Sequence, residues 1–375
     1  MPQLKVMTVV GTRPEIIRLS RTMQVLDELC DHVTVHTGQN YDYELNEVFY
    51  KDLGLRKPDY YLEAAGATAA ETIGQVIAKT DAVLEKVRPE ALLVLGDTNS
   101  CLAVIPAKRR KIPIFHMEAG NRCFDMRVPE EINRRIVDHV ADINLTYTEH
   151  SRRYLLAEGL RGDCVIKTGS PMKEVLEYHR AGIEASDVHA RLGVERGRYF
   201  TVSLHREENV DDPPHLAGLV QALNDLAEQY AHPLIFSVHP RTRKRLDALG
   251  AKLHPAVRTM PPLGFLDYNA LQQHAFCAVS DSGTITEESA ILGFPAITAR
   301  EAHERPEGMD EGVVVMSGLR PERIRQAVAM TRRQFEMSGP PRLPPDYDAP
   351  NVSWKVAKII LSYTDYVRRV VWSNA

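Results

Sequence analysis

The strongest constraint on the fold is a repeated alternation of short apolar runs with longer amphipathic stretches. In the first half, β-branched apolar runs predict strands at residues 6–10, 33–37, 91–95, 114–117 and 143–147. Helical periodicity lies between them at residues 15–29, 71–87, 99–109 and 130–140. Strands and helices that alternate in this way build a parallel sheet with helices on both faces. The sequence therefore predicts an α/β fold.

The alternation stops at a polar stretch near residues 168–171 and then starts again. Strands are predicted at residues 200–204, 234–238, 278–280 and 296–298, and helices at 215–229, 267–274, 285–292 and 321–335. A chain of 375 residues is long enough for two domains that each bury a core. We expect an N-terminal domain at residues 1–170 and a C-terminal domain at 171–352, with a last helix after the proline-rich segment 340–350. The carboxyl ends of both sheets are expected to meet in a cleft between the domains.

Composition excludes several classes of protein. Hydrophobic residues make up 44% and charged residues 26% of the chain, which excludes a disordered, collagenous or coiled-coil protein. The net charge of −4 argues against nonspecific binding to nucleic acid or membrane. The five cysteines are scattered and form no CxxC pair, which is typical of reduced thiols. With no signal peptide and no apolar run of about 18 residues, we expect a cytoplasmic protein.

The turn after the first predicted strand reads Gly11-Thr12-Arg13-Pro14-Glu15. It is not the GxGxxG fingerprint of dinucleotide-binding domains, and that fingerprint occurs nowhere in the chain, which argues against an NAD-binding domain. Arg13 stands beside the free amides of a helix start, a place suited to an anion, and Arg18 follows on the same helix. A surface ion pair between an arginine and Glu15 explains the pattern equally well.

Three carboxylates are predicted at the ligand-binding edge of the first sheet. Asp97 and Glu118 each follow a predicted strand, and Glu130 lies in the first turn of a helix with the predicted apolar face Ile132, Ile136 and Val140. Ligands bind at the carboxyl ends of strands in open α/β sheets, and neighbouring carboxylates shift one another's pKa, which suits acid–base chemistry. Two structural alternatives remain open: Asp97 caps the helix after it, or Glu130 pairs with Arg134.

Two stretches of the second half also follow predicted strands. Thr284 and Glu287 have the spacing of a capping box, so Ser282 and Gly283 would present backbone amides to a phosphate, and Glu288 would reach ribose hydroxyls. A capped structural helix is the alternative. His205, after the strand at residues 200–204, suits binding of a diphosphate or transfer of a proton. HExxH, P-loop and metal-ligand patterns are absent from the sequence, so no metal is expected.

In combination and in this order, these motifs resemble the non-hydrolysing UDP-N-acetylglucosamine 2-epimerases. The match runs through GTRPE at 11–15, GDT at 96–98, EAG at 118–120, PEE-N-R at 129–134, HRE-N at 205–209, SDSG-EE at 280–288 and ERPE at 304–307. The resemblance implies two Rossmann-like domains of the GT-B type, with the last helix, about residues 353–375, returning to the first domain. It also implies an active site in the interdomain cleft, no cofactor, a UDP-sugar substrate and a homodimer.

The family's reaction inverts C2 of a UDP-sugar. The C2 proton is removed as UDP leaves from C1, and UDP adds back to the resulting 2-acetamidoglycal as C2 is reprotonated on its other face. The resemblance assigns catalysis to Asp97, Glu118, Glu130 and His205. It assigns substrate binding to Arg13, Arg18, His205, Phe265, Ser282, Gly283, Glu288 and Arg305.

Three segments depart from the plain N-acetylglucosamine enzymes. Residues 39–44, 121–125 and 300–305 look like those of UDP-N-acetyl-L-fucosamine synthases, which epimerise UDP-2-acetamido-2,6-dideoxy-L-talose for bacterial capsule or O-antigen. Glu207 also stands where the plain enzymes often carry a second arginine, which argues against activation by a second substrate molecule. The alternatives are an ordinary UDP-N-acetylglucosamine 2-epimerase, a GT-B glycosyltransferase and a nucleotide-sugar sensor without chemistry. The three carboxylates argue against the sensor.

Overall fold

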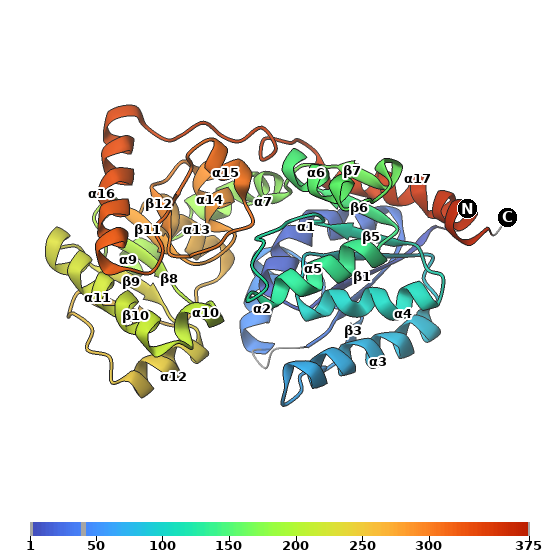
Figure 1. Ribbon diagram of the computed structural model, residues 1–375, viewed down its shortest axis with the longest axis horizontal. Coiled ribbons are helices and arrows are strands. Elements are labelled where there is room, and N and C mark those ends of the chain that lie inside the picture. Colours follow the sequence, from blue (N-terminus) through green and yellow to red (C-terminus); the bar gives the residue numbers. More distant parts are fainter. Residues whose placement is uncertain (1–2, 39–42, 374–375) are drawn as a thin grey trace. The chain divides into compact units, whose positions relative to one another are not determined.

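The computed structural model describes residues 3–38 and 43–373 and divides into two compact units. Unit 1 comprises residues 1–178 and 346–375, and unit 2 comprises residues 179–345. Each unit is a parallel α/β sheet covered by helices, as the alternating sequence pattern predicts (Figure 1).

Unit 1 contains seven parallel strands in the order β3-β2-β1-β4-β5-β6-β7. Their bounds are β1 Lys5–Val10, β2 Asp31–His36, β3 Tyr60–Tyr61, β4 Ala91–Leu95, β5 Ile114–Met117, β6 Ile143–Thr146 and β7 Val165–Lys167. β1 lies between β2 and β4, with Val6 opposite His32 on one side and Ala91 on the other. The central strands β1, β4 and β5 are almost fully buried, which explains their continuous apolar runs.

Helices cover both faces of this sheet. One face is covered by α3 (Ala69–Val87), α4 (Val104–Arg109) and α5 (Pro129–Val140), whose Val83, Ala107 and Val137 pack with strand residues in one core. The other helices of this unit are α1 Arg13–Leu29, α2 Tyr43–Asp52, α6 Glu149–Ala157, α7 Met172–Tyr178 and α17 Val352–Trp372. Single 3₁₀ turns occupy Asn99–Ala103 and Gly162–Cys164.

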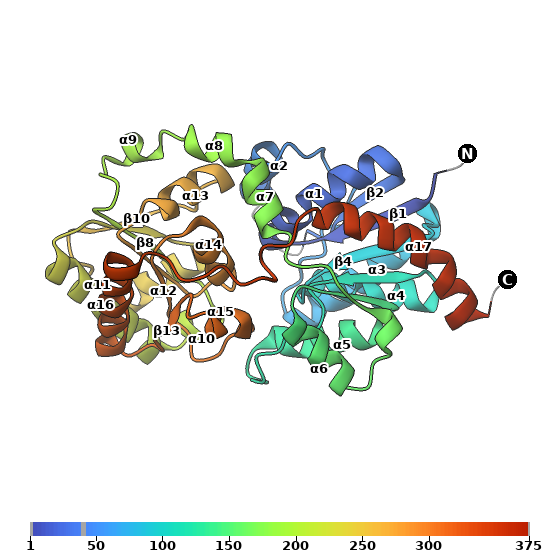
Figure 2. The same cartoon turned by 90° about the horizontal axis from the view of Figure 1, so that it is seen from above.

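The last helix returns to the first unit, where α17 packs against α1 (Figures 1 and 2). The chain leaves unit 1 after Tyr178 rather than near residue 170, because α7 also packs on α1 and Glu174 accepts the backbone N–H of Ser353 at 2.9 Å. It re-enters at Asp346 rather than near residue 353, because Asp346 binds Lys167 and the amide of Glu149.

Unit 2 contains six parallel strands in the order β10-β9-β8-β11-β12-β13. Their bounds are β8 Phe200–Ser203, β9 Leu234–Ser237, β10 Val257–Met260, β11 Cys277–Ser280, β12 Ala296–Thr298 and β13 Val315–Met316. The helices are α8 Arg180–Glu184, α9 Val188–Leu192, α10 Glu207–Val210, α11 Pro213–Tyr230, α12 Pro240–Leu249, α13 Phe265–Gln273, α14 Ile285–Leu292, α15 Pro306–Asp310 and α16 Pro321–Ser338. The apolar sides of α11 and α16 form one core with β8, β9 and β11.

The predicted strands and the long helices are confirmed to within a few residues at their ends. The strands that the sequence did not predict are β3, β7, β10 and β13, which all lie toward the edges of the sheets and have two to four residues. Short, half-exposed edge strands carry little apolar signal. No helix in the part of the chain that the structure describes is both long and apolar enough to cross a bilayer.

We expect the contact between α17 and α1 to contribute strongly to the stability of unit 1. Ile360 is fully buried, whereas its neighbour Leu361 is 68% exposed. Ile360→Ala should lower the free energy of unfolding by about 2–5 kcal/mol, and the control Leu361→Ala by no more than about 0.5 kcal/mol. Both tryptophans of the chain, Trp354 and Trp372, lie in α17, so their fluorescence during urea unfolding reports this helix directly. Equal losses in the two variants would contradict the packing.

Candidate active site

In each sheet the strand order reverses at one point. Arg13 and Asp97 follow the strands that flank it in unit 1, and His205 and Ser282 follow those that flank it in unit 2. The reversal lies between β1 and β4 in unit 1 and between β8 and β11 in unit 2. Loops that leave neighbouring strands in opposite directions open a crevice at such a point, and ligands of α/β proteins bind there.

The turn after β1 is organised by the buried carboxylate of Glu15, which is 2% exposed. Glu15 accepts the amides of Gly11 and Thr12 and the hydroxyls of Thr98 and Ser100, and so ties the end of β1 to the loop after β4. Burial raises the pKa of Glu15 to about 7, although these four hydrogen bonds favour the charged form. The alternative of a surface ion pair at Glu15 is wrong, because the side chain is inside the protein.

Arg18 forms a buried ion pair with Glu118, and the two side chains are only 4% and 9% exposed. Glu118 follows β5 with a left-handed backbone (φ 64°), a conformation that costs a non-glycine residue about 1–3 kcal/mol. Its other oxygen accepts the side-chain amide of Asn121 at 3.1 Å. A Cβ at Gly96 would lie 4.0 Å from Oε2 of Glu118, so this carboxylate reaches the residue directly before Asp97. The structure thus brings two of the predicted catalytic acids together.

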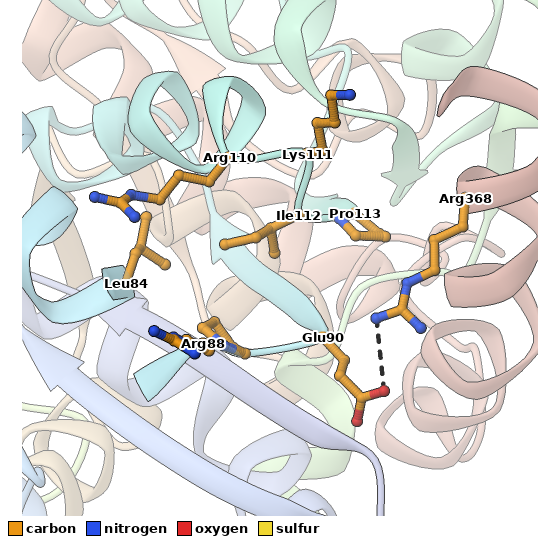
Figure 3. Close-up of a pocket in the computed structure, with 9 residues that line it drawn as sticks. Leu84, Arg88, Glu90, Arg110, Lys111, Ile112, Pro113 and Arg368 are labelled. Atoms are coloured by element: carbon orange, nitrogen blue, oxygen red, sulfur yellow. Dashed lines mark ion pairs between the residues drawn. The ribbon is translucent and has the colours of Figure 1, made fainter. Parts of the chain in front are cut away.

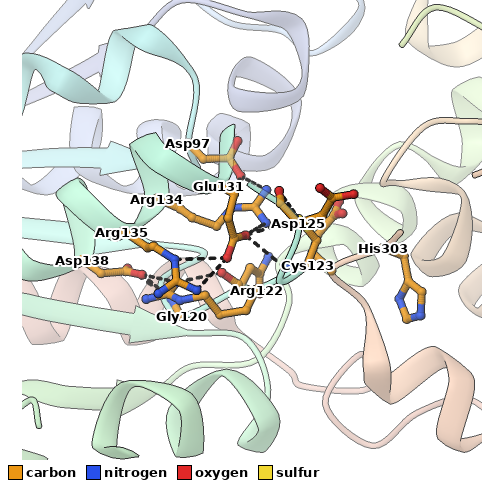
Figure 4. Close-up of polar contacts among 12 residues, drawn as sticks. Asp97, Gly120, Arg122, Cys123, Asp125, Glu131, Arg134, Arg135, Asp138 and His303 are labelled. Carbon is orange, nitrogen blue, oxygen red and sulfur yellow. Dashed lines mark hydrogen bonds and ion pairs between the residues drawn. The ribbon is translucent and has the colours of Figure 1, made fainter. Parts of the chain in front are cut away.

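Asp97 is held by helix α5 (Figure 4). Its Oδ2 accepts hydrogen bonds from Nε and Nη2 of Arg134 at 3.0 and 2.7 Å, and Nη1 of the same guanidinium donates to Glu131 at 3.0 Å. The side chains of Arg134 and Glu131 are 4% and 0% exposed. Sequence reasoning considered Arg134 only as a partner of Glu130 and missed Glu131, although both lie in the PEE-N-R motif. The predicted cap by Asp97 is replaced by this ion pair, and Thr98 takes the N-cap position of the 3₁₀ turn.

The predicted apolar face of α5 is wrong. Ile132 and Ile136 are 46% and 39% exposed, whereas Glu131, Arg134 and Asp138 are buried. The buried side of the helix carries both kinds of residue: Val137 lies in the apolar core with Val140 half-buried against it, while Glu131, Arg134 and Asp138 meet polar groups. Glu130 is half-buried in the first turn, and its spacing of four residues from Arg134 and seven from Val137 puts it on the same side of the helix as these buried residues.

Asp138 fixes the start of the loop at residues 120–128. It accepts the amide of Gly120 at 3.1 Å and Nη1 of Arg122 at 2.7 Å, and Nδ1 of His116 lies 3.0 Å from it. Burial opposes the protonated ring of His116, but the hydrogen bond and charge of Asp138 outweigh it and raise the pKa of this histidine. The loop is thus fixed at its base by buried charges.

In unit 2, the fully buried Asp281 organises the reversal point. Its carboxylate accepts the amides of His205 and Arg206 at 3.0 Å each, together with the side-chain amide of Asn209 at 3.0 Å. Nδ1 of His205 lies 3.2 Å from the same carboxylate, while the imidazole stays 44% exposed. Asp281 therefore orients the predicted catalytic histidine. The signal for it was its place in the SDSG motif, directly after β11.

The helix after this motif begins at Ile285, as predicted, but the predicted capping box is wrong. Among the described residues, no side-chain capping bond is made by Thr284, and Glu287 instead lies 3.2 Å from Arg305 in a buried ion pair. Ser282 and Gly283 remain half-buried before the helix. A Cβ at Gly283 would come within 2.4 Å of the Glu304 carboxylate, so a side chain there would displace that group.

The remaining predicted binding residues lie deeper in unit 2. Glu288 is 8% exposed and accepts Nε2 of Gln272 at 2.9 Å. Phe265 is 2% exposed, and its ring packs edge-on against His179. Arg305 is 3% exposed.

In unit 1, Arg13 is half-buried at the start of α1 with its guanidinium 5.6 Å from the ring of Phe49.

A cavity of about 360 Å³ opens at the opposite end of the unit 1 sheet, beside the residues that precede β4 and β5 (Figure 3). It is lined by Leu84, Arg88, Pro89, Glu90, Arg110, Lys111, Ile112, Pro113 and Arg368. Arg110 pairs with Asp81 and Glu85, and Arg368 pairs with Glu90 and Asp365, so acids balance much of its positive charge. None of the residues that the sequence singled out lines this cavity, and the carboxyl-end sites remain the candidates.

Comparison with known proteins agrees with this geometry. The profile of the family described as UDP-N-acetylglucosamine 2-epimerase matches residues 25–361. The chain belongs to this family. It is therefore an isomerase that acts on C2 of a UDP-sugar.

Individual relatives in the family cover most of the chain. The UDP-N-acetylglucosamine 2-epimerase of Methanocaldococcus jannaschii is 34% identical over 87% of this chain and 91% of its own. The UDP-2,3-diacetamido-2,3-dideoxy-D-glucuronate 2-epimerase of Pseudomonas aeruginosa is also 34% identical, over 84% of this chain and 88% of its own.

A solved structure of UDP-N-acetylglucosamine 2-epimerase from Rickettsia bellii has a TM-score of 0.90 and 51% identity over 99% of this chain and 100% of its own. The M. jannaschii enzyme in complex with UDP-GlcNAc and UDP has a TM-score of 0.90 at 31% identity and covers 96% of this chain and 100% of its own. The fold is of the GT-B type expected for the family.

Glu15 gives a test of the buried network. A pKa that folding raises from 4.5 to about 7 means that the folded protein holds a proton which the unfolded chain has released. This contribution to stability is present below about pH 4.5 and is lost as the pH rises to about 7, by about 3 kcal/mol in total. Urea unfolding of the wild type, measured against Glu15→Gln from pH 5 to 8, should show the wild type losing its relative stability over this range. A difference that is independent of pH would contradict the buried, protonated carboxyl.

Proposed function

We propose that the protein converts UDP-2-acetamido-2,6-dideoxy-L-talose to UDP-N-acetyl-L-fucosamine by elimination and re-addition of UDP. The observation that carries the proposal is the pair of acids at the carboxyl edge of the unit 1 sheet, after β4 and β5. Asp97 is fixed by Arg134 and Glu118 by Arg18, and the Glu118 carboxylate lies close to the residue before Asp97. Two oriented carboxylates at a ligand-binding edge suit a reaction in which C2 loses a proton on one face and gains one on the other.

In the proposed mechanism, one carboxylate removes the C2 proton while the C1–O bond to UDP breaks. The products of this step are the 2-acetamidoglycal, UDP and a protonated carboxyl. UDP then attacks C1 as an acid delivers a proton to the opposite face of C2, so the electrons and protons balance without an oxidant. Asp97, Glu118 and Glu130 are the proposed proton-transfer groups, with His205 as a further acid–base group.

In unit 2 the diphosphate is proposed to bind at Ser282 and Gly283 before α14, beside His205 in the Asp281 network. The amide of Ser282 donates to Oγ of Ser280 at 3.1 Å, so a phosphate would have to replace that hydroxyl or bind at the amide of Gly283. In unit 1, Arg13 and Arg18 are the proposed diphosphate-binding residues. Glu288, Arg305 and the Phe265 backbone are proposed to hold the nucleoside side of the substrate.

The choice of sugar rests on the loop at residues 121–128. A 6-deoxy sugar presents a methyl group where N-acetylglucosamine presents a hydroxymethyl group, and a methyl group favours an apolar surface. Phe124 and Met126 are 65% and 60% exposed, so both offer such a surface, whereas Val128 is buried and packs the loop. The segment 39–42, which carries part of the resemblance to the L-fucosamine enzymes, lies outside the described residues.

The second candidate is conversion of UDP-N-acetylglucosamine to UDP-N-acetylmannosamine. It is favoured by the R. bellii protein, which shares 51% identity and carries the name UDP-N-acetylglucosamine 2-epimerase. The P. aeruginosa relative is named for a different sugar at 34% identity. Because members of this family are named for different sugars, the substrate has to be measured.

The elimination mechanism predicts exchange at C2. Epimerisation in deuterated water, without added cofactor or acceptor, should place deuterium at C2 of the product, because the proton removed from C2 exchanges with solvent deuterium. NMR of the product measures the incorporation. Epimerised product that keeps its original C2 proton would exclude the mechanism.

The carboxylates should control the rate. Asp97→Asn, Glu118→Gln and Glu130→Gln should each lower kcat by about 10²–10⁴-fold, the usual size of a general acid–base contribution. Glu149→Gln removes a half-exposed carboxylate on α6 of the same unit and serves as the control, with an unchanged kcat. If all three site variants kept the kcat of the control, these acids would be structural only.

The substrate is decided by comparing kcat/KM for the two UDP-sugars. We expect the L-talo/L-fuco pair to exceed UDP-N-acetylglucosamine by at least about 10-fold, which corresponds to about 1.4 kcal/mol. Phe124→Ser should reduce this ratio if the loop meets the methyl group. Equal values, or a preference for UDP-N-acetylglucosamine, would assign the second function.

A further inference from the structure

A continuous chain of contacts joins the loop at residues 121–128 to Asp97 through helix α5 (Figure 4). Oε2 of Glu131 accepts the backbone amide of Cys123 at 3.0 Å and also accepts Nη1 of Arg134 at 3.0 Å. The remaining nitrogens of that guanidinium, Nε and Nη2, hold Oδ2 of Asp97. One carboxylate and one guanidinium thus separate the loop backbone from the proposed base.

Burial makes this chain of contacts stiff. Glu131 is fully buried, and its second oxygen accepts Nε and Nη2 of Arg135 at 3.2 and 3.0 Å. A buried charge and its hydrogen-bond partners have to move together, because a buried charge without a partner costs several kcal/mol of stability. A shift of the Cys123 backbone therefore has to be accompanied by a shift of Glu131 and of the Arg134 guanidinium.

We propose that Glu131 is a positioning residue that couples the conformation of the 121–128 loop to the orientation of Asp97. The proposal rests on the proposed function, in which the loop contacts the sugar and Asp97 transfers a proton. A sugar that seats the loop correctly then also places Asp97, and a sugar that does not fit leaves Asp97 misplaced. Since a displacement of about 1 Å can cost about 10²-fold in rate, the loop selects substrates through kcat as well as through binding.

The first test compares a variant of Glu131 with a control variant on a neighbouring helix. Glu131→Gln keeps an acceptor for the Cys123 amide but removes the charge that holds Arg134. It should lower kcat by about 10–100-fold, the usual cost of losing an outer positioning partner, and leave KM within about threefold. Arg153→Gln removes an exposed cation on α6 that pairs with Glu149, and should leave both constants within about twofold.

The second test measures the loop directly and does not depend on activity. Sγ of Cys123 lies 3.3 Å from Glu131, and burial together with this neighbouring carboxylate raises the pKa of the thiol. The rate of alkylation by iodoacetamide, followed on the Cys123 peptide by mass spectrometry, should rise several-fold in Glu131→Gln and stay unchanged in Arg153→Gln. Glu131→Asp keeps the charge and shortens the side chain, so faster alkylation in that variant reports release of the loop, and it also replaces Glu131→Gln if the latter does not fold.

The outcomes separate this proposal from the proposed function. Loss of kcat and faster Cys123 alkylation in the Glu131 variants support the coupling. Unchanged kcat in both Glu131 variants, or unchanged alkylation, would overturn it even if Asp97→Asn is inactive. A fully active Asp97→Asn would instead overturn the role of Asp97 in the proposed function, while the alkylation rates still decide whether Glu131 holds the loop.

Discussion

The buried ion pair between Arg18 and Glu118 is the interaction on which the site in unit 1 depends. Both side chains are almost completely buried. Removal of either would leave the other charge without this partner, at a cost of about 3–5 kcal/mol in folding stability. The pair joins the second turn of α1 to the residue after β5, across the strand β4 that precedes Asp97. It also holds Glu118 in a left-handed conformation that an isolated glutamate would avoid. The position of one carboxylate thus depends on a residue 100 positions away in the chain.

Other buried charges connect separate elements of the site in the same way. Glu15 joins the β1 turn to the β4 loop, Arg134 joins α5 to Asp97, and Asp138 joins α5 to the loop after β5. Unit 2 has one such centre in Asp281, which gathers His205, Arg206 and Asn209. In both units a buried acid orients backbone amides or cations at the reversal point, beside half-exposed groups such as Arg13 and His205. The charges that stabilise the site are therefore also the charges that orient its proposed reacting groups.

Much of the fold could be predicted because parallel strands buried on both faces read as continuous apolar runs. The runs that became β1, β4 and β5 were found for that reason, and the acids that follow them could be placed at one edge of the sheet. The partners of those acids could not be predicted. Spacing along the helix offered Glu130 as one possible partner of Arg134, and only the folded chain shows that its guanidinium binds Asp97 and Glu131. The exposed Ile132 and Ile136 show the same limit, because a helical pattern does not reveal what its neighbour is made of.

The sequence by itself determined the α/β architecture, the order of the motifs and the family, because each of these depends on local pattern and composition. Only the tertiary structure decided which charges meet: Arg18 with Glu118, Asp97 with Arg134, and Arg305 with Glu287. It also decided that Glu15 lies inside the protein with its pKa raised to about 7 by burial. These outcomes depend on distances between residues far apart in the chain and on the exclusion of water, and neither quantity is encoded in the spacing of residues along one segment.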